Sequence, residues 1–304
     1  GIDSSLQTAM ISKLDDNFIP ATIHHQDKDK ITEKIELFEP FIKKKIHRLN
    51  ANIELNKKDA LKCSSEIGIP FLTHDFVGRY QISNYFKSKK CKVFFGGDGA
   101  DELFGGYELY KKLNWKKKSN KNISGYSNFV TRNYVKLLNF GLKRRMEKFY
   151  QDVNKRYSFI KSHERNIQSS LFADYFFSAV SVYNIGTDLV ACSNAIEPRN
   201  LFIQKKILEN IVNLPPKYKI NLNSKDKKFI LKPILKKIFL KYFPKKLIFK
   251  KQGFSGYPNE LRPILENQNL NFTNNLKIVN QIKSFDRSTE WKMINLKIFL
   301  ENNK

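Results

Sequence analysis

The sequence lacks a membrane-spanning run, a secretory signal and any clustered cysteines. No stretch of its 304 residues approaches the roughly 18 uninterrupted apolar residues of a transmembrane helix, and the first residues show no signal-peptide pattern. The three cysteines, Cys63, Cys91 and Cys192, form no CxxC pair, which argues against a disulfide framework and a zinc site. We therefore expect a cytoplasmic protein, with no membrane partner, whose length permits a substantial buried core.

Arginine is also scarce, although the chain is strongly basic. Only 10 of the 55 basic residues are Arg, and the net charge is +26. Such a charge is typical of nucleic-acid-binding proteins. However, the lysines are spread along the chain, and the abundant Lys, Asn, Ile and Phe share AT-rich codons. The charge therefore favours solvated faces and attraction to phosphate ligands, and a nucleic-acid partner is not expected.

The sequence begins without Met, at "GIDSS" (residues 1–5), which has the character of a loop already under way. We expect the chain to be a fragment or a processed piece. Further along, the apolar patterns predict a short strand over 17–25, a buried strand over 91–95 and a helix over 101–113. From residue 116 onward almost every pattern has the helical period, as it does after Pro233. The sequence thus predicts an α/β part over 1–115 and an α-helical part over 116–304.

Two loops contain the residues best suited to bind a ligand or to take part in catalysis. The first is "GIDSS", where hydroxyls and backbone amides at a helix start can bind phosphate oxygens. The second is "GGDGADELFGGY" (residues 96–107), in which glycines and acids follow a buried strand and open a helix. An acid among phosphate donors is useful when Mg²⁺ lies between them, because Mg²⁺ is held by one or two carboxylates plus phosphate oxygens. Loops at the carboxyl ends of parallel strands converge, so Asp3 and Asp101 are predicted to share a Mg²⁺ on a nucleotide.

These stretches resemble a known family. "GIDSS" is similar to the end of the SGGxDS pyrophosphate loop of the N-type ATP pyrophosphatases (PP-loop proteins). "GGDGADELFGGY" is similar to the S-G-[DE]-G-x-D-E-x-F-G-G-Y signature of the asparagine synthase (glutamine-hydrolysing) synthetase domain, with Gly96 in place of Ser. Asp188 and Glu197 match the family's D-x₈-E, while "KKFILK" (227–232) and "KQGF" (251–254) resemble its later lysine motifs. The matches follow the family's order along essentially the whole chain.

The resemblance implies an α/β fold with a parallel-sheet PP-loop core, followed by an α-rich half that returns Lys228 and Lys251 to the site. It implies that ATP and Mg²⁺ are bound, that the aspartate side chain is adenylated with release of pyrophosphate, and that ammonia from glutamine then gives asparagine. The implied catalytic residues are Lys251, Asp98 and Lys228. The implied nucleotide-binding residues are Gly1, Asp3, Ser4, Ser5, Gly97 and Gly99, and the implied metal ligands are Asp3 and Asp101.

Several positions depart from the family pattern. We expect this chain to lack the family's upstream glutamine amidotransferase domain and the strand before the first loop. The family's R-x-P-F-L-D reads Arg199 to Gln204 without its Pro and Asp, and Lys232 replaces an Arg, a change that matters where a planar fork is needed. Alternative hypotheses are a relative that amidates or cyclises another carboxylate, such as a polysaccharide sugar acid or a β-lactam precursor, a tRNA-modifying PP-loop protein, and a non-catalytic interaction domain.

Overall fold

The computed structural model is described here over four stretches and a few isolated positions between them. These stretches are residues 1–25, 34–51, 75–112 and 162–250; the isolated positions are 59, 62–63, 65–68, 148, 152 and 155. The chain divides into two compact units that interleave in sequence. The first comprises residues 1–10, 95–185 and 200–250, and the second comprises 11–94, 186–199 and 251–304. Each unit therefore draws on both sides of residue 115, and the boundary expected there stays a prediction.

The second unit contains a small parallel sheet covered by a helix. Strands β1 (Ala21–His25) and β2 (His47–Ala51) run parallel, with Ala21 opposite His47. Helix α5 (Asp75–Ser88) packs against β1. The sequence predicted β1 but not β2, because "HRLNA" has neither an apolar run nor a clear alternation. The ladder to β1 stabilises β2 in spite of its polar composition, so tertiary context overrides local propensity.

Short helices and a second pair of strands complete the described elements. Pro40 occupies the start of α3 (Glu39–Ile42), where its missing N–H is not needed, so the helical spacing around it yields one turn rather than a long helix. Strands β3 (Val93–Gly96) and β4 (Glu197–Asn200) form the other two-stranded sheet. Helix α10 (Ile185–Cys192) precedes β4. The structure is thus a mixed α/β arrangement with small sheets, as predicted at the level of fold class.

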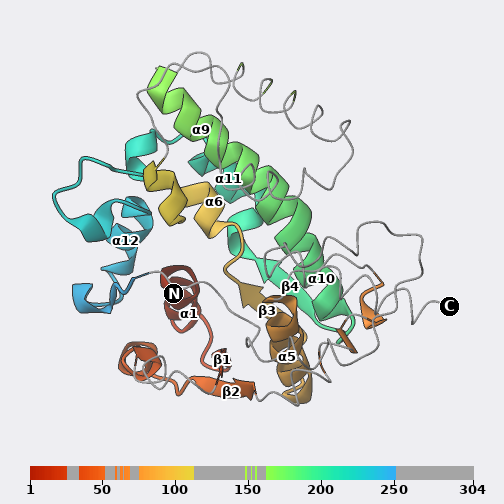
Figure 1. Ribbon diagram of the computed structural model, residues 1–304. Coiled ribbons are helices and arrows are strands. Elements are labelled where there is room, and N and C mark those ends of the chain that lie inside the picture. Colours follow the sequence, from red (N-terminus) through yellow and green to blue (C-terminus); the bar gives the residue numbers. More distant parts are fainter. Residues whose placement is uncertain are drawn as a thin grey trace, which may run out of the picture. The chain divides into compact units, whose positions relative to one another are not determined.

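The first unit is built around helix α6 (Ala100–Phe104), which packs on the long helix α9 (Ser162–Asp174), as Figure 1 shows. The other elements of this unit are α1 (Ile2–Ile11), the 3₁₀ turn η1 (Glu108–Lys112), the π-helix η2 (Tyr175–Asn184), η3 (Leu201–Ile203), α11 (Lys205–Ile211), η4 (Pro216–Tyr218), η5 (Lys227–Phe229), α12 (Pro233–Phe239) and η6 (Lys245–Leu247). Tyr110, Ile167, Leu171, Ile220 and Leu231 form one buried apolar cluster of this unit. Another joins α1, α6, η2, η3 and α12 and is formed by Leu6, Ala100, Leu103, Phe104, Tyr175, Ala179, Phe202 and Leu235. This core fixes the start of α1 and the start of α6 relative to each other.

Helix α6 is much shorter than the helix predicted over 101–113. It ends at Gly105, whose φ of +69° is left-handed, and whose successor Gly106 donates its backbone N–H to the carbonyl of Asp101 over 2.7 Å. A left-handed glycine closing a helix in this way is a common C-cap. The chain then continues as the separate 3₁₀ turn η1. The apolar period of the sequence spans both pieces, and only the glycine pair separates them.

Candidate functional site

The carboxylates of Asp3 and Asp101 meet at one lysine. Asp3 lies in the first turn of α1 and Asp101 in the first turn of α6. The Nζ atom of Lys232 lies 2.7 and 2.6 Å from the two carboxylate oxygens of Asp3 and 2.6 Å from Oδ1 of Asp101. Three segments far apart in sequence thus converge on a single cation. The predicted convergence of the two loops is present within the first unit.

Lys232 is the most buried member of this acid–lysine cluster. Its side chain is 6% exposed, against 19% for Asp3 and 22% for Asp101. Burial alone would lower the pKa of the Lys232 ammonium, but the two carboxylates outweigh burial and raise it above its usual range. Lys232 is therefore charged and neutralises one of the two acids. Its backbone is left-handed, with φ of +51°, just before α12.

One glycine is required where the three segments meet, and a second lies beside the start of α1. A Cβ atom on Gly106 would overlap Oδ1 of Asp101 and Cε of Lys232, so only glycine fits beside this ion pair. A Cβ atom on Gly97 would lie 3.4 Å from Cβ of Asp3, in ordinary contact. The glycine-rich loop after β3 therefore lies directly against the start of α1. Packing explains why residue 106 of this loop is glycine, whether or not a ligand binds there.

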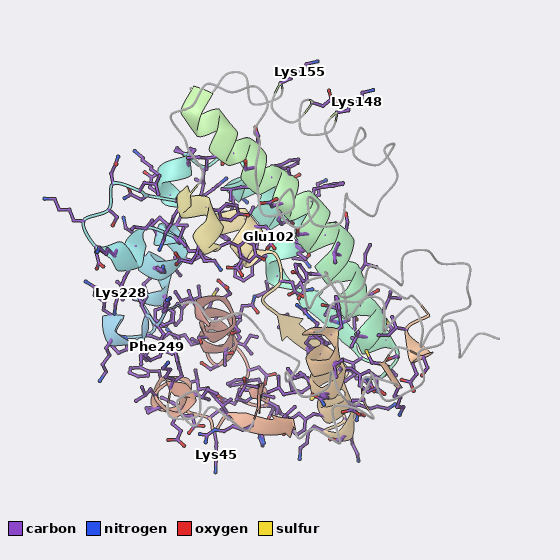
Figure 2. All side chains as sticks on the ribbon, viewed as in Figure 1. Lys45, Glu102, Lys148, Lys155, Lys228 and Phe249 are labelled. Atoms are coloured by element: carbon purple, nitrogen blue, oxygen red, sulfur yellow. The ribbon has the colours of Figure 1, made fainter. Side chains whose placement is uncertain are left out.

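Another acid of the loop, Glu102, has a structural role. Glu102 is 2% exposed and accepts a hydrogen bond of 2.6 Å from the hydroxyl of Tyr107. Figure 2 places Glu102 at α6, in the interior of the first unit. The neighbouring Tyr110 donates in the same way to Asp174 of α9 over 2.7 Å. Burial is the larger cause and the nearby acids the smaller one that raise the pKa of both tyrosines. Both hydroxyls therefore stay protonated and donate hydrogen bonds that stabilise the turn after α6.

The other predicted nucleotide-binding residues lie close to the acid–lysine cluster. Gly1 precedes α1, and Ser4 and Ser5 lie in its first turns; the Ser4 hydroxyl donates to the Gly1 carbonyl over 3.3 Å. Asp98 is half-buried in the turn between β3 and α6, and Gly99 is the N-cap of α6. "GIDSS" is thus mostly helix rather than loop, because its backbone already makes the bond from Ser5 N–H to Gly1 over 3.0 Å.

Of the two predicted catalytic lysines, only Lys228 is among the described residues, and it is not one of those that converge there. The side chain of Lys228 is exposed, at the edge of the first unit in Figure 2, and its backbone N–H donates to Asp226 over 2.9 Å. Lys251 lies outside the described residues. Sequence reasoning noticed Lys232 only as a departure from the family's Arg. The role of Lys232 could have been inferred from its charge, because Lys in place of the family's Arg keeps a cation at this position.

The acid pair is compatible with a divalent cation. Among the described residues no group of three or more His, Cys, Asp and Glu side chains could hold a metal. However, Mg²⁺ commonly takes one or two carboxylates and fills its other positions with water and phosphate oxygens. Two carboxylates that already contact one cationic nitrogen at about hydrogen-bond distance fit that donor set. The Lys232 ammonium lies at the position where both acids point.

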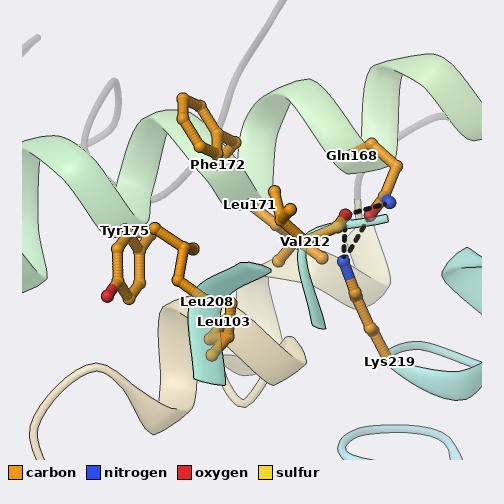
Figure 3. Close-up of a pocket in the computed structure, with 8 residues that line it drawn as sticks. All are labelled: Leu103, Gln168, Leu171, Phe172, Tyr175, Leu208, Val212 and Lys219. Carbon is orange, nitrogen blue, oxygen red and sulfur yellow. Dashed lines mark hydrogen bonds between the residues drawn. The ribbon is translucent and has the colours of Figure 1, made fainter. Parts of the chain in front are cut away.

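A second buried amine lies elsewhere in the first unit. Lys219 is 2% exposed, and its Nζ donates to Oε1 of Gln168 over 2.8 Å and to the Val212 carbonyl over 2.9 Å (Figure 3). Burial lowers its pKa to about 7. The three residues line a cavity of about 10 Å³ together with Leu103, Leu171, Phe172, Tyr175 and Leu208. None of the predicted site residues that the structure describes lines this cavity, which is no larger than a single water requires.

Comparison with known proteins identifies the family. The sequence model of the asparagine synthase family matches residues 1–271, nearly nine-tenths of the chain. The chain belongs to the asparagine synthase family. This confirms the resemblance seen in the two loops, and the family consists of ATP-dependent ligases. A search of curated proteins finds no match to this member of the asparagine synthase family. Within its described residues, no helix is both long and apolar enough to cross a membrane.

Proposed function

We propose that this chain is the synthetase part of an enzyme that activates the side-chain carboxylate of aspartate with ATP and amidates it to give asparagine. The observation that carries the proposal is the meeting of Asp3 and Asp101 at Lys232, at the two loops that the family uses for ATP. The proposed organisation is a PP-loop core over 1–115, which has the fold of the adenine nucleotide alpha hydrolases, and a helical part over 116–304.

The proposed chemistry has two steps. A carboxylate oxygen of the acceptor forms a bond to the α-phosphorus of ATP, and the bond to the bridging oxygen breaks, so pyrophosphate leaves with its electrons. Ammonia then forms a C–N bond to the acyl carbon of the acyl-adenylate, AMP leaves, and a proton is lost to solvent. Both steps require positioning and charge neutralisation more than covalent chemistry by the protein.

The residues around the acid–lysine cluster supply these needs. Gly97 and Gly99 carry no side chains, so a phosphate would reach the backbone of the loop after β3, and Gly1, Ser4 and Ser5 would offer amides and hydroxyls to phosphate oxygens. Asp3 and Asp101 would hold Mg²⁺, which neutralises phosphate charge when bound. Lys232 would then exchange its acid partners for a phosphate oxygen. Lys236, whose pKa burial and the nearby Lys232 and Lys111 lower to about 8, adds a second cation close by.

The roles of Lys251, Lys228 and Asp98 remain part of the proposal. Lys251 would stabilise charge on the α-phosphate and the leaving group, with Lys228 as a second candidate, and Asp98 would position the intermediate or the incoming amine. Ammonia would come from glutamine through an amidotransferase domain of the same enzyme. A cytoplasmic location would suit the use of ATP and the three cysteines, all of which are free thiols.

The proposal is tested by exchange of labelled pyrophosphate into ATP, which reports the first step alone. Full-length protein should catalyse exchange that depends on aspartate and Mg²⁺. Exchange supported by a sugar acid or a β-amino acid, and not by aspartate, would assign the other acceptor class, which the changed positions Leu201 and Gln204 favour. Absence of exchange with every acid, together with salt-dependent tRNA binding, would replace the proposal with the tRNA-modifying alternative.

A further inference from the structure

The side chain of Asn200 places a buried hydrogen-bond acceptor beside the loop that follows β3. Asn200 ends β4 and is 3% exposed. Its Nδ2 donates to Oδ1 of Asn184 over 3.1 Å, and its own Oδ1 is buried with no hydrogen-bond donor among the described residues. A buried amide oxygen left in this state costs about 1–3 kcal/mol. Such groups are uncommon in folded proteins and need a reason, such as a bound ligand.

The orphaned oxygen lies where the side chain of residue 96 would be. A Cβ atom built on Gly96 would overlap Oδ1 of Asn200, and it would lie 4.0 Å from Oδ2 of Asp98. Gly96 is the position at which the resembling signature has Ser. In this chain the carboxamide of Asn200 therefore fills the space of that missing side chain, and the Asp98 carboxylate lies near the same space.

We infer that Asn200 and Asp98 form a binding site for an N–H donor, namely ammonium or the amine that attacks the acyl-adenylate. An amide oxygen and a carboxylate are both acceptors, so together they favour a cation with several N–H groups and disfavour a phosphate. The role of this site in amidation rests on the proposed function, whereas the binding of an N–H donor there does not. Asn184, the partner of Asn200, ends the π-helix η2, and π-helical segments are frequent at functional sites.

The kinetic test uses full-length Asn200→Leu, which keeps the volume and removes the acceptor. Pyrophosphate exchange, which needs no amine, should stay at the parent rate. The KM for ammonium in the complete reaction should rise about threefold to tenfold, as expected for one lost hydrogen bond. A rise in the KM for ATP instead would assign the donor to the nucleotide's amino group and overturn the inference. A fall in kcat with an unchanged ammonium KM would also overturn it.

A matched control and a conservative variant separate binding from folding. Asn194 is equally buried at 3% exposure and donates to Ser83 over 2.8 Å, so Asn194→Leu disturbs a buried amide away from the loop and should leave the ammonium KM unchanged. Asn200→Asp retains an acceptor oxygen and should retain the parent KM or lower it. An Asn200→Asp variant that folds but behaves like Asn200→Leu would overturn the inference.

A second measurement does not depend on the reaction. The melting temperature of the parent is followed in ammonium chloride and in tetramethylammonium chloride at equal concentration, since the second cation has the same charge and no N–H group. Ammonium should stabilise the parent more than tetramethylammonium, and Asn200→Leu should abolish that difference. An equal response of the parent to both salts would overturn the site. If ammonium stabilises the parent but no acceptor acid supports pyrophosphate exchange by the parent, the proposed function fails while the binding site stands.

Discussion

Replacing Lys219 by methionine should change how the stability of the protein depends on pH. Lys219 is 2% exposed and has a Gln168 oxygen and the Val212 carbonyl as partners, and no carboxylate of the described residues pairs with it. Its pKa falls from 10.5 to about 7 in the fold because burial disfavours the charged ammonium. Between these two values the unfolded chain binds more protons than the folded one, so folding stability rises with pH.

The size of the effect follows from the two pKa values. A difference of one between the folded and unfolded pKa values is worth about 1.4 kcal/mol. The buried amine therefore reduces the free energy of unfolding by about 4 kcal/mol near pH 7. Near pH 9 the folded amine is neutral, and removing its proton costs less free energy because the pH is closer to 10.5, so the reduction falls to about 2 kcal/mol. Lys219→Met removes this pH-dependent part and leaves Oε1 of Gln168 without its donor, a cost of about 1–3 kcal/mol that does not vary with pH.

The assay is urea unfolding of parent and Lys219→Met at several pH values from about 6 to 9.5, a range that spans the folded pKa. The stability of the parent relative to the variant should improve by about 2 kcal/mol between pH 7 and pH 9. The exposed Lys217, two residues away, supplies the control: Lys217→Met should show no such trend. A constant difference between parent and Lys219→Met across the range would refute the reasoning, because it would mean that Lys219 titrates as it does in water.

Three other outcomes follow from the site. Asp101→Asn removes one of the two acids that neutralise buried Lys232; it should cost about 1–3 kcal/mol in unfolding free energy and abolish pyrophosphate exchange, so unchanged exchange would contradict the assignment of this acid. Gly106→Ala places a methyl on that ion pair and should cost about 1–3 kcal/mol, whereas Gly97→Ala meets only ordinary contacts and should melt near the parent while binding ATP more weakly, as thermal unfolding and a binding titration would show. Tyr107→Phe removes the donor to the buried carboxylate of α6 and should cost about 1.5–3 kcal/mol; a melting temperature equal to the parent's would show that water replaces the hydroxyl.

Part of the fold and of the site follows from local patterns. The strand over 93–96 was predictable because it falls on the apolar run "CKVFF", and the strand over 21–25 falls within the stretch "NFIPATIHH" predicted as a strand. The stripe after Pro233 was predictable too, and Leu235 and Phe239 are buried in α12 as its period requires. The strand over 47–51 was not predictable, because its pairing with β1, and not its own composition, makes it a strand.

The sequence by itself determined the family and the acidic loop chemistry of this protein. The glycine spacing of "GGDGADELFGGY" and the acids Asp3 and Asp101 of the two loops are local features, and the order of the motifs along the chain identifies the asparagine synthase family. Only the tertiary structure decided which cation meets those acids and which side chain fills the space beside Gly96. Lys232 and Asn200 lie more than 90 residues from the loops that they contact, and no local periodicity encodes a contact between segments so far apart. Those contacts exist because the apolar core around α6 holds the segments together.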